Sequence, residues 1–269
     1  MAVEHYENFP VASVLLPKQL REPIEVIYRF ARQADDFADE GKATDAERLA
    51  NLATFRDELK CIENGVQPQT PLFIELARII QQHRIPLQLF VDLLDAFSQD
   101  VVKKRYASFD ELLDYCRRSA NPVGRILLHL YQQATPANLA YSDAICTALQ
   151  LINFWQDVNK DSAIGRIYLP QEDLLKFNVS ELAITQQQSD DNWRALMAFE
   201  IDRARQMMLQ GKPLGRILRG RIGMEMRLII AGGLRVLSKI EQVEYDVFNR
   251  RPELNKWDWL VISSALFRH

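Results

Sequence analysis

Apolar residues recur at helical spacing through nearly every segment of this chain. Pro23 suits the first turn of a helix, and Ile24, Ile27 and Ala31 follow it at spacings of three and four. Later segments of the same kind open at a Pro or a capping residue, or close at a Gly. The predicted helices after the first cover 45–63, 71–83, 86–100, 108–118, 121–133, 136–161, 190–210, 213–248 and 256–267.

The segment 213–248 is predicted to hold two helices, broken near Gly232 and Gly233. The sequence shows no alternating strand pattern and no tandem repeat, and no linker-like composition divides it. We therefore expect an all-α fold in a single domain, residues 1–269, with roughly a dozen helices.

Two copies of one acidic pattern interrupt these apolar helices. The first contains Asp35, Asp36 and Asp39, and the second contains Asp157 and Asp161. Residues four apart share one helix face, so each copy aims two carboxylates in one direction. Carboxylates so close repel unless a cation lies between them. Mg²⁺ suits this arrangement because it takes one or two carboxylates and borrows diphosphate oxygens, so facing helices could form a metal-diphosphate cage.

Acidic pairs at this spacing are also common on solvated helix faces, usually with Lys or Arg between them. The first copy has no basic residue within it and is flanked by small or apolar residues. The second copy ends the apolar stretch 148–158. Acids placed in core-facing stretches favour a functional interpretation over a solvated face.

Polar neighbours extend the first copy. Arg32 lies three residues before Asp35, so its guanidinium can either clamp diphosphate oxygens or pair with the acids of its own helix. Tyr28 lies one turn earlier. Its hydroxyl can bind a phosphate oxygen, its ring can face a cationic intermediate, or it can simply pack in the core.

The second copy belongs to a longer polar stripe on an apolar helix. The stripe consists of Gln150, Asn153, Asp157 and Asp161, which step at three, four and four. Lys160 lies within the copy and can contact the diphosphate. Arg166 and Tyr168 follow Gly165, where the helix should end, and can close over a bound diphosphate.

Composition restricts the partners and the compartment. The chain has 269 residues with a net charge of −3 and no long basic run, which argues against nucleic acid as a partner. Three Cys without metal-ligand spacing fit reduced thiols, and no secretory signal is evident, so we expect a cytoplasmic protein. The stretch 216–227 mixes basic and apolar residues, and either contacts the inner face of the membrane peripherally or forms an ordinary core helix.

Together these positions resemble the squalene/phytoene synthase family over almost the whole chain, as far as Tyr245 to Arg250. The matching positions are Arg32, Asp35, Asp36, Asp39 and Glu40, then Gln150, Asn153, Asp157, Asp161, Arg166, Tyr168 and Pro170. The resemblance implies an isoprenoid (prenyl) synthase fold with a central apolar cavity. It also implies Mg²⁺ held by Asp35, Asp39, Asp157 and Asp161, and ionisation of an allylic or cyclopropylcarbinyl diphosphate.

Two segments are similar to the bacterial branch that hydrolyses presqualene diphosphate to hydroxysqualene for hopanoid synthesis. They are Asn121-Pro122-Val123-Gly124-Arg125 and Phe154-Trp155-Gln156-Asp157, in which Gln156 replaces the Arg usual in carotenoid-type members. That branch implies two companion enzymes, a presqualene diphosphate synthase and a hydroxysqualene reductase. Two alternatives stay open: a head-to-head farnesyl diphosphate synthase making presqualene diphosphate, squalene or dehydrosqualene, and a non-catalytic assembly or lipid-binding protein.

Asn121 stands at a Pro-broken helix, and we hypothesise that it holds the water that forms the alcohol. An amide can both donate to and accept from water, and a helix break frees backbone groups that can do the same. A purely structural kink is the alternative.

Overall fold

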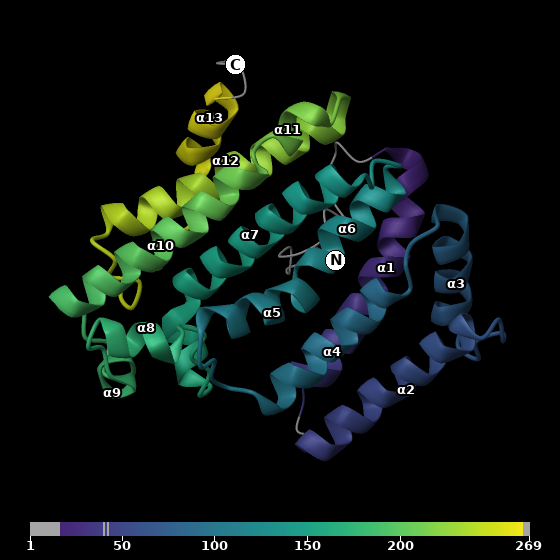
Figure 1. The fold of residues 1–269 in the computed structure, drawn as a ribbon, viewed down its shortest axis with the longest axis horizontal. Helices are drawn as coiled ribbons and strands as arrows, with labels where there is room; N and C mark the ends of the chain where they lie inside the picture. The colour runs from purple at the N-terminus through teal and green to yellow at the C-terminus, as the bar shows by residue number, and fades with distance from the viewer. Residues whose placement is uncertain (1–16, 40, 42, 266–269) are drawn as a thin grey trace. The chain divides into compact units, whose positions relative to one another are not determined.

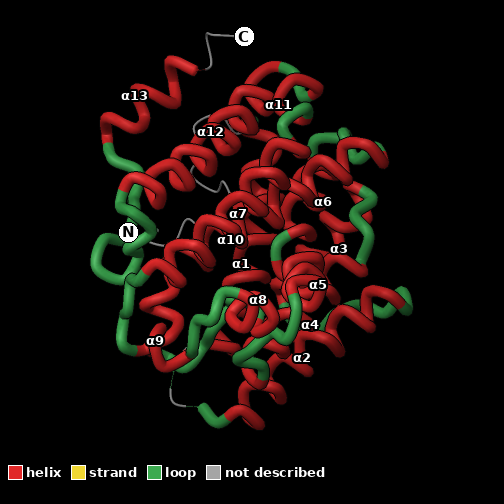
Figure 2. The backbone as a smooth tube through the Cα atoms, turned by 60° about the vertical axis from the view of Figure 1, so that its left-hand side comes forward, coloured by secondary structure: helices red, strands yellow, loops and turns green. Residues whose placement is uncertain are grey.

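The computed structural model describes residues 17–39, 41 and 43–265, and Figures 1 and 2 show these residues as helices joined by loops, without a strand. This confirms the all-α prediction. The helices are α1 (Lys18–Asp39), α2 (Asp45–Glu63), α3 (Pro71–His83), α4 (Gln88–Val102), α5 (Phe109–Ser119), α6 (Asn121–Leu130), α7 (Pro136–Ala163), α8 (Gln171–Lys176), α9 (Glu181–Thr185), α10 (Asp191–Gly211), α11 (Leu214–Ile217), α12 (Gly220–Gln242) and α13 (Lys256–Ala265).

Local signals explain the helix ends that were predicted correctly. Thr44 accepts a hydrogen bond from the Glu47 N–H, and the Glu47 carboxylate accepts one from the Thr44 N–H at 2.8 Å, which forms a capping box at the start of α2. Gly65, with φ of 68°, follows the end of α2. Pro71 opens α3.

Two helix boundaries differ from the prediction. α1 begins at Lys18 and carries Pro23 inside it, so the predicted start at Pro23 was wrong. α12 runs unbroken through Gly232 and Gly233, and the chain instead turns before Gly220, whose φ is 65°. A Cβ on Gly233 would lie 2.7 Å from the Met208 side chain, so this glycine serves close packing of helices.

The chain divides into two compact units. The first comprises 1–103 and 117–139, and the second comprises 104–116 and 140–269. The first unit holds α1 to α4 and α6, and the second holds most of α7 and all of α8 to α13. Each unit buries apolar residues of its own, and the single-domain expectation stays a prediction.

An aromatic cluster forms the centre of the first unit. Phe30 of α1 is fully buried, and its ring lies 5.7 Å from Phe55 of α2, 5.7 Å from Phe73 of α3 and 5.4 Å from Phe90 of α4. These contacts bury one face of α1 against three helices. They therefore fix which side of α1 presents the first acidic motif.

The second unit is built around α7, α10 and α12. Trp155 of α7 and Trp193 of α10 are buried, and the Trp193 ring packs 4.5 Å from Phe248. The Trp193 indole N–H also donates to the Tyr245 carbonyl at 2.9 Å, which satisfies its polar atom. None of the described helices is long and apolar enough to cross a membrane.

Candidate active site

The first acidic motif lies on the last turns of α1. Asp35 and Asp36 are partly exposed, and Arg32 binds both: Nη1 lies 3.3 Å from Asp35 Oδ2 and Nη2 lies 2.7 Å from Asp36 Oδ1. The intrahelical ion pairs left open as an alternative are therefore present. Asp39 is exposed, and Glu40 falls outside the described residues. Half-buried Tyr28 packs against the core of the first unit.

Arg48 of α2 holds the end of α1, a contact that sequence reasoning missed. Its guanidinium donates to the Ala38 carbonyl in the last turn of α1, and to Ala43 and Gly41 at 3.1 and 3.2 Å. The last carbonyls of a helix have no partner within the helix, and a basic side chain satisfies them well. Arg48 therefore positions the turn that carries Asp35 and Asp39.

The polar stripe predicted on α7 lies in the second unit. Gln150, Asn153 and Asp161 are half-buried there, while Asp157 is buried with 7% of its surface exposed. A buried carboxylate is costly unless it is paired and hydrogen-bonded. The partners of Asp157 therefore decide what this motif can do.

Arg251 is the main partner of Asp157. Its Nε lies 2.7 Å from Oδ1 and its Nη2 lies 2.9 Å from Oδ2, so guanidinium and carboxylate meet as a fork. Lys160 adds a third contact, with Nζ 3.0 Å from Oδ1. Burial acts to raise the pKa of Asp157, but the hydrogen bonds and charges of Arg251 and Lys160 outweigh it and hold the pKa below its ordinary value.

The segment that carries Arg251 is fastened along α7. Gln156 Nε2 donates to the Pro252 carbonyl at 2.6 Å, and Asn159 Nδ2 donates to the Phe248 carbonyl at 3.1 Å. We call residues 248–252 the α7 strap. Gln156 is thus one of the residues that place Arg251 on Asp157.

Arg166 and Tyr168 follow the end of α7, as expected. Gly165 has φ of 79°, and the Arg166 N–H donates to the Asp161 carbonyl at 2.8 Å. The Tyr168 ring stacks on Phe154, with centroids 3.8 Å apart and planes 10° apart. This stacking fixes the ring beside α7, and the predicted role of both residues in closing over diphosphate stays a prediction.

Asn121 stands at the predicted helix break. α5 ends at Ser119 and α6 begins at Asn121, with Pro122 in its first turn. Asn121 is buried, with 7% of its surface exposed. The break is confirmed, and the water-binding role of Asn121 stays a prediction.

The acidic residues suit Mg²⁺ in their chemistry. Among the residues that the structure describes, no three or more His, Cys, Asp or Glu side chains gather into a metal centre made of protein alone. Mg²⁺ usually takes one or two carboxylates, keeps several waters and completes its shell with substrate phosphates. The pairs Asp35/Asp39 and Asp157/Asp161 fit that mode, and at Asp157 the ion would share or replace the contacts of Arg251 and Lys160.

The fold and the two acidic motifs define a class, the isoprenoid synthases. The structure is similar to squalene synthase HpnC from Alicyclobacillus acidocaldarius, with a TM-score of 0.83 and 35% identity over 90% of each chain. A family model described as squalene/phytoene synthase matches residues 2–258. The chain therefore belongs to the squalene/phytoene synthase family, whose members act on prenyl diphosphates and typically depend on divalent metal ions.

Relatives within the family carry different names. A hydroxysqualene synthase of Zymomonas mobilis is 42% identical over 170 residues, which cover 62% of this chain and 55% of that protein. A hydroxysqualene synthase of Rhodopseudomonas palustris is 33% identical over 96% of this chain and 86% of its own length. A phytoene synthase of Arthrospira platensis is 30% identical over 96% of this chain and 87% of its own.

Proposed function

We propose that this protein converts presqualene diphosphate and water into hydroxysqualene and diphosphate. The observation that carries the proposal is the buried Asp157, paired with Arg251 and Lys160 at the centre of the polar stripe on α7. A cluster of this kind suits the binding and release of an anionic leaving group. The specific reaction is supported by the two hydroxysqualene synthases among the relatives, at 42% and 33% identity.

In the proposed mechanism, Asp35 and Asp39 of the first unit and Asp157 and Asp161 of the second would each serve as ligands of Mg²⁺, and Asp36 holds Arg32 beside the first pair. Mg²⁺ bound there would neutralise charge on the leaving diphosphate. The cationic groups that would bind its phosphate oxygens are Arg32 in the first unit and Lys160 and Arg166 in the second. Gln150 and Asn153 hydrogen-bond to it, and the hydroxyls of Tyr28 and Tyr168 can do the same.

The carbon–oxygen bond to diphosphate breaks, and the electron pair leaves with the diphosphate. A carbocation remains, which aromatic rings stabilise through their quadrupoles while apolar side chains exclude stray water. The cyclopropane ring opens as the cation rearranges to the linear C30 skeleton. One water, held by Asn121, then adds its oxygen to the rearranged cation, and the proton that the water loses passes to the released diphosphate, which leaves the alcohol. The substrate would come from a companion presqualene diphosphate synthase, and a hydroxysqualene reductase would consume the product.

A second candidate is a head-to-head synthase that joins two prenyl diphosphates. The relative that favours it is the phytoene synthase, which aligns with 96% of this chain. Both candidates share the ionisation of a diphosphate, so the acidic motifs do not distinguish them. The substrate does.

A product assay tests the proposal. The purified protein is incubated with Mg²⁺ and either presqualene diphosphate or farnesyl diphosphate, without nicotinamide, and hexane extracts are analysed by mass spectrometry. A C30 alcohol from presqualene diphosphate, with farnesyl diphosphate left intact, supports the hydrolytic reaction. Consumption of farnesyl diphosphate establishes the condensing synthase instead, and no turnover of either substrate favours the non-catalytic alternative.

A further inference from the structure

The four tryptophans of this chain fall into two contrasting pairs. Trp155 and Trp193 are almost fully buried, with 0% and 1% of their surface exposed. Trp257 and Trp259 of α13 are 76% and 49% exposed, and Leu260 beside them is 62% exposed. With Val261, which is 52% exposed, the described side chains of this ten-residue helix include four large apolar ones that face outward. Such a concentration marks an interaction surface rather than scattered surface residues.

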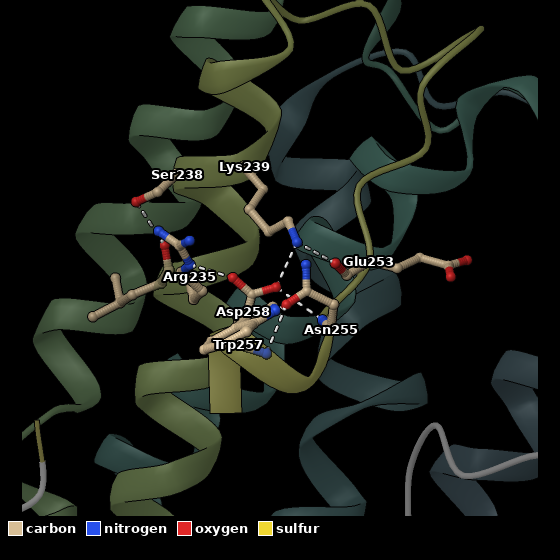
Figure 3. Close-up of polar contacts among 8 residues, drawn as sticks. Arg235, Ser238, Lys239, Glu253, Asn255, Trp257 and Asp258 are labelled. Atoms are coloured by element: carbon tan, nitrogen blue, oxygen red, sulfur yellow. Dashed lines mark hydrogen bonds and ion pairs between the residues drawn. The ribbon is translucent and has the colours of Figure 1, made fainter. Parts of the chain in front are cut away.

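The opposite side of α13 is firmly attached to α12. Figure 3 shows Asp258 between Arg235 and Lys239 of α12, with Arg235 Nε 2.7 Å from its carboxylate. Only 1% of the Asp258 surface is exposed, and Ile262, one turn later, is buried at 2%. Buried charge with two cationic partners ties the helix in place. The exposed side chains therefore belong to a docked helix.

The start of α13 is capped as well. Asn255 accepts from the N–H groups of Trp257 and Asp258 at 2.9 and 3.0 Å, while the Asn255 N–H donates to the Asp258 carboxylate at 2.8 Å. This reciprocal pair satisfies free N–H groups of the first turn. It also fixes the direction in which the two exposed Trp side chains leave the helix.

Basic residues gather near the same end of the second unit. The segment 212–227 holds five basic residues and one acidic residue, although the whole chain has a net charge of −3. Arg216, Arg219 and Arg221 are exposed there. α11 and α13 both pack on α12, and in Figures 1 and 2 they lie at the same end of this unit. Lys256, at the start of α13, is exposed too.

We propose that this end of the second unit binds the surface of an anionic phospholipid bilayer. Trp257, Trp259 and Leu260 enter the interfacial layer, where amphipathic indole rings and aliphatic side chains are stabilised. The arginines of 212–227 contact the headgroup phosphates. Since no described helix can cross a membrane, α13 lies on the bilayer and does not span it.

A second copy of this chain is the other occupant that an apolar face can have. In a two-fold dimer the same patch meets itself, so the arginine-rich segments would approach each other. Like charges oppose that contact, whereas an anionic bilayer complements them. Charge therefore favours the bilayer.

Sedimentation with vesicles tests the proposal on the full chain. We expect binding to vesicles of phosphatidylcholine mixed with phosphatidylglycerol and much weaker binding to phosphatidylcholine alone. Leu260→Asp should lower the partition coefficient about tenfold, the loss expected when a buried leucine side chain is removed. Leu175→Asp, at another leucine that is 82% exposed on α8, is the matched control and should bind as the wild type does.

The basic segment has its own variants. Arg219→Gln and Arg221→Gln should each lower binding to anionic vesicles about fivefold, because each basic residue near such a surface contributes about 1 kcal/mol. Arg21→Gln, at an exposed arginine of α1, is the control. Circular dichroism of every variant shows whether it folds.

Brominated lipids locate the contact. They quench only fluorophores that enter the bilayer, and Trp155 and Trp193 are buried in the protein. Quenching that survives Trp155→Phe and disappears in Trp257→Phe/Trp259→Phe supports insertion of α13.

Absence of binding to anionic vesicles, or equal binding by wild type and Leu260→Asp, overturns the proposal. A dimer in light scattering that Leu260→Asp dissociates, without vesicle binding, assigns the face to a second copy. None of these readouts uses turnover, so they stand apart from the proposed reaction.

Discussion

At the scale of single residues, the carboxylate of Asp157 links folding to the proposed chemistry. Asp157→Asn removes one charge from the proposed diphosphate site and keeps the side-chain shape, so we expect turnover to fall at least about 10³-fold while helicity is retained. Product formation and circular dichroism measure the two effects. Asp191→Asn, at a fully exposed aspartate of α10, is the control and should leave turnover unchanged. Normal turnover by Asp157→Asn would remove this motif from the site.

Arg251 gives a second residue-scale prediction, independent of turnover. Arg251→Gln leaves buried Asp157 with Lys160 as its cationic contact among the described residues, so the metal-free protein should lose about 1–2 kcal/mol of stability. Urea unfolding in the presence of a chelator measures this. Arg250→Gln, at the exposed neighbouring arginine, should unfold as the wild type does. An unchanged midpoint for Arg251→Gln would mean that the fork does not contribute to stability.

At the scale of elements, the break between α5 and α6 places a buried amide in the chain. If Asn121 holds the attacking water, Asn121→Ala should lower the ratio of alcohol to rearranged hydrocarbon among the products, since water then competes less well for the cation. Mass spectrometry of the extract measures the ratio. Asn138→Ala is the matched control, because Asn138 is also buried, at 3% exposed, and its side chain donates to the Gln133 carbonyl. The same ratio in both variants would leave Asn121 a structural role only.

Sequence patterns predicted those elements whose signals lie within a few residues. α2 and α3 have the predicted bounds because Thr44, Asn64 and Pro71 act on their own helix ends. The unbroken α12 was missed, because the packing of Gly233 against Met208 depends on a second helix. α8 and α9 were also missed, since five or six residues are too short to show a period.

The candidate site likewise contains residues that the sequence pattern predicts and residues that it does not. The acidic motifs and the stripe on α7 repeat at helical spacing, so they are visible along the sequence. Arg251 meets Asp157 across 94 positions, and Arg48 reaches the end of α1 from another helix. Contacts of that kind depend on tertiary packing, so no local sequence pattern predicts them.

At the scale of the whole molecule, a buried acid makes stability depend on pH. Glu200 of α10 is fully buried, and burial raises its pKa to about 8 from 4.5, with Asp173 adding to the rise while Arg203 opposes it. The folded protein therefore binds a proton that the unfolded chain releases. This contribution is fully present below pH 4.5 and is lost as pH rises through about 8.

The corresponding variant is Glu200→Gln, which keeps the neutral shape at every pH. The wild type should become less stable between pH 4.5 and 8 by an amount that the variant lacks. Urea midpoints across this range measure the difference. Exposed Glu63→Gln is the control and should follow the wild type. Parallel curves for wild type and Glu200→Gln would show that another group causes the pH dependence.

The α7 strap couples positions 156 and 251, because both act on Asp157 through the same short segment. Gln156 holds the Pro252 carbonyl, and the adjoining Arg251 neutralises Asp157. A side chain without an N–H donor at 156 would lose that tether, and an Arg there would bring another positive charge to a carboxylate that already has two cationic partners. The effects of substitutions at 156 and 251 should therefore not add, because a change at either position alters the neutralisation of Asp157 through the same short segment.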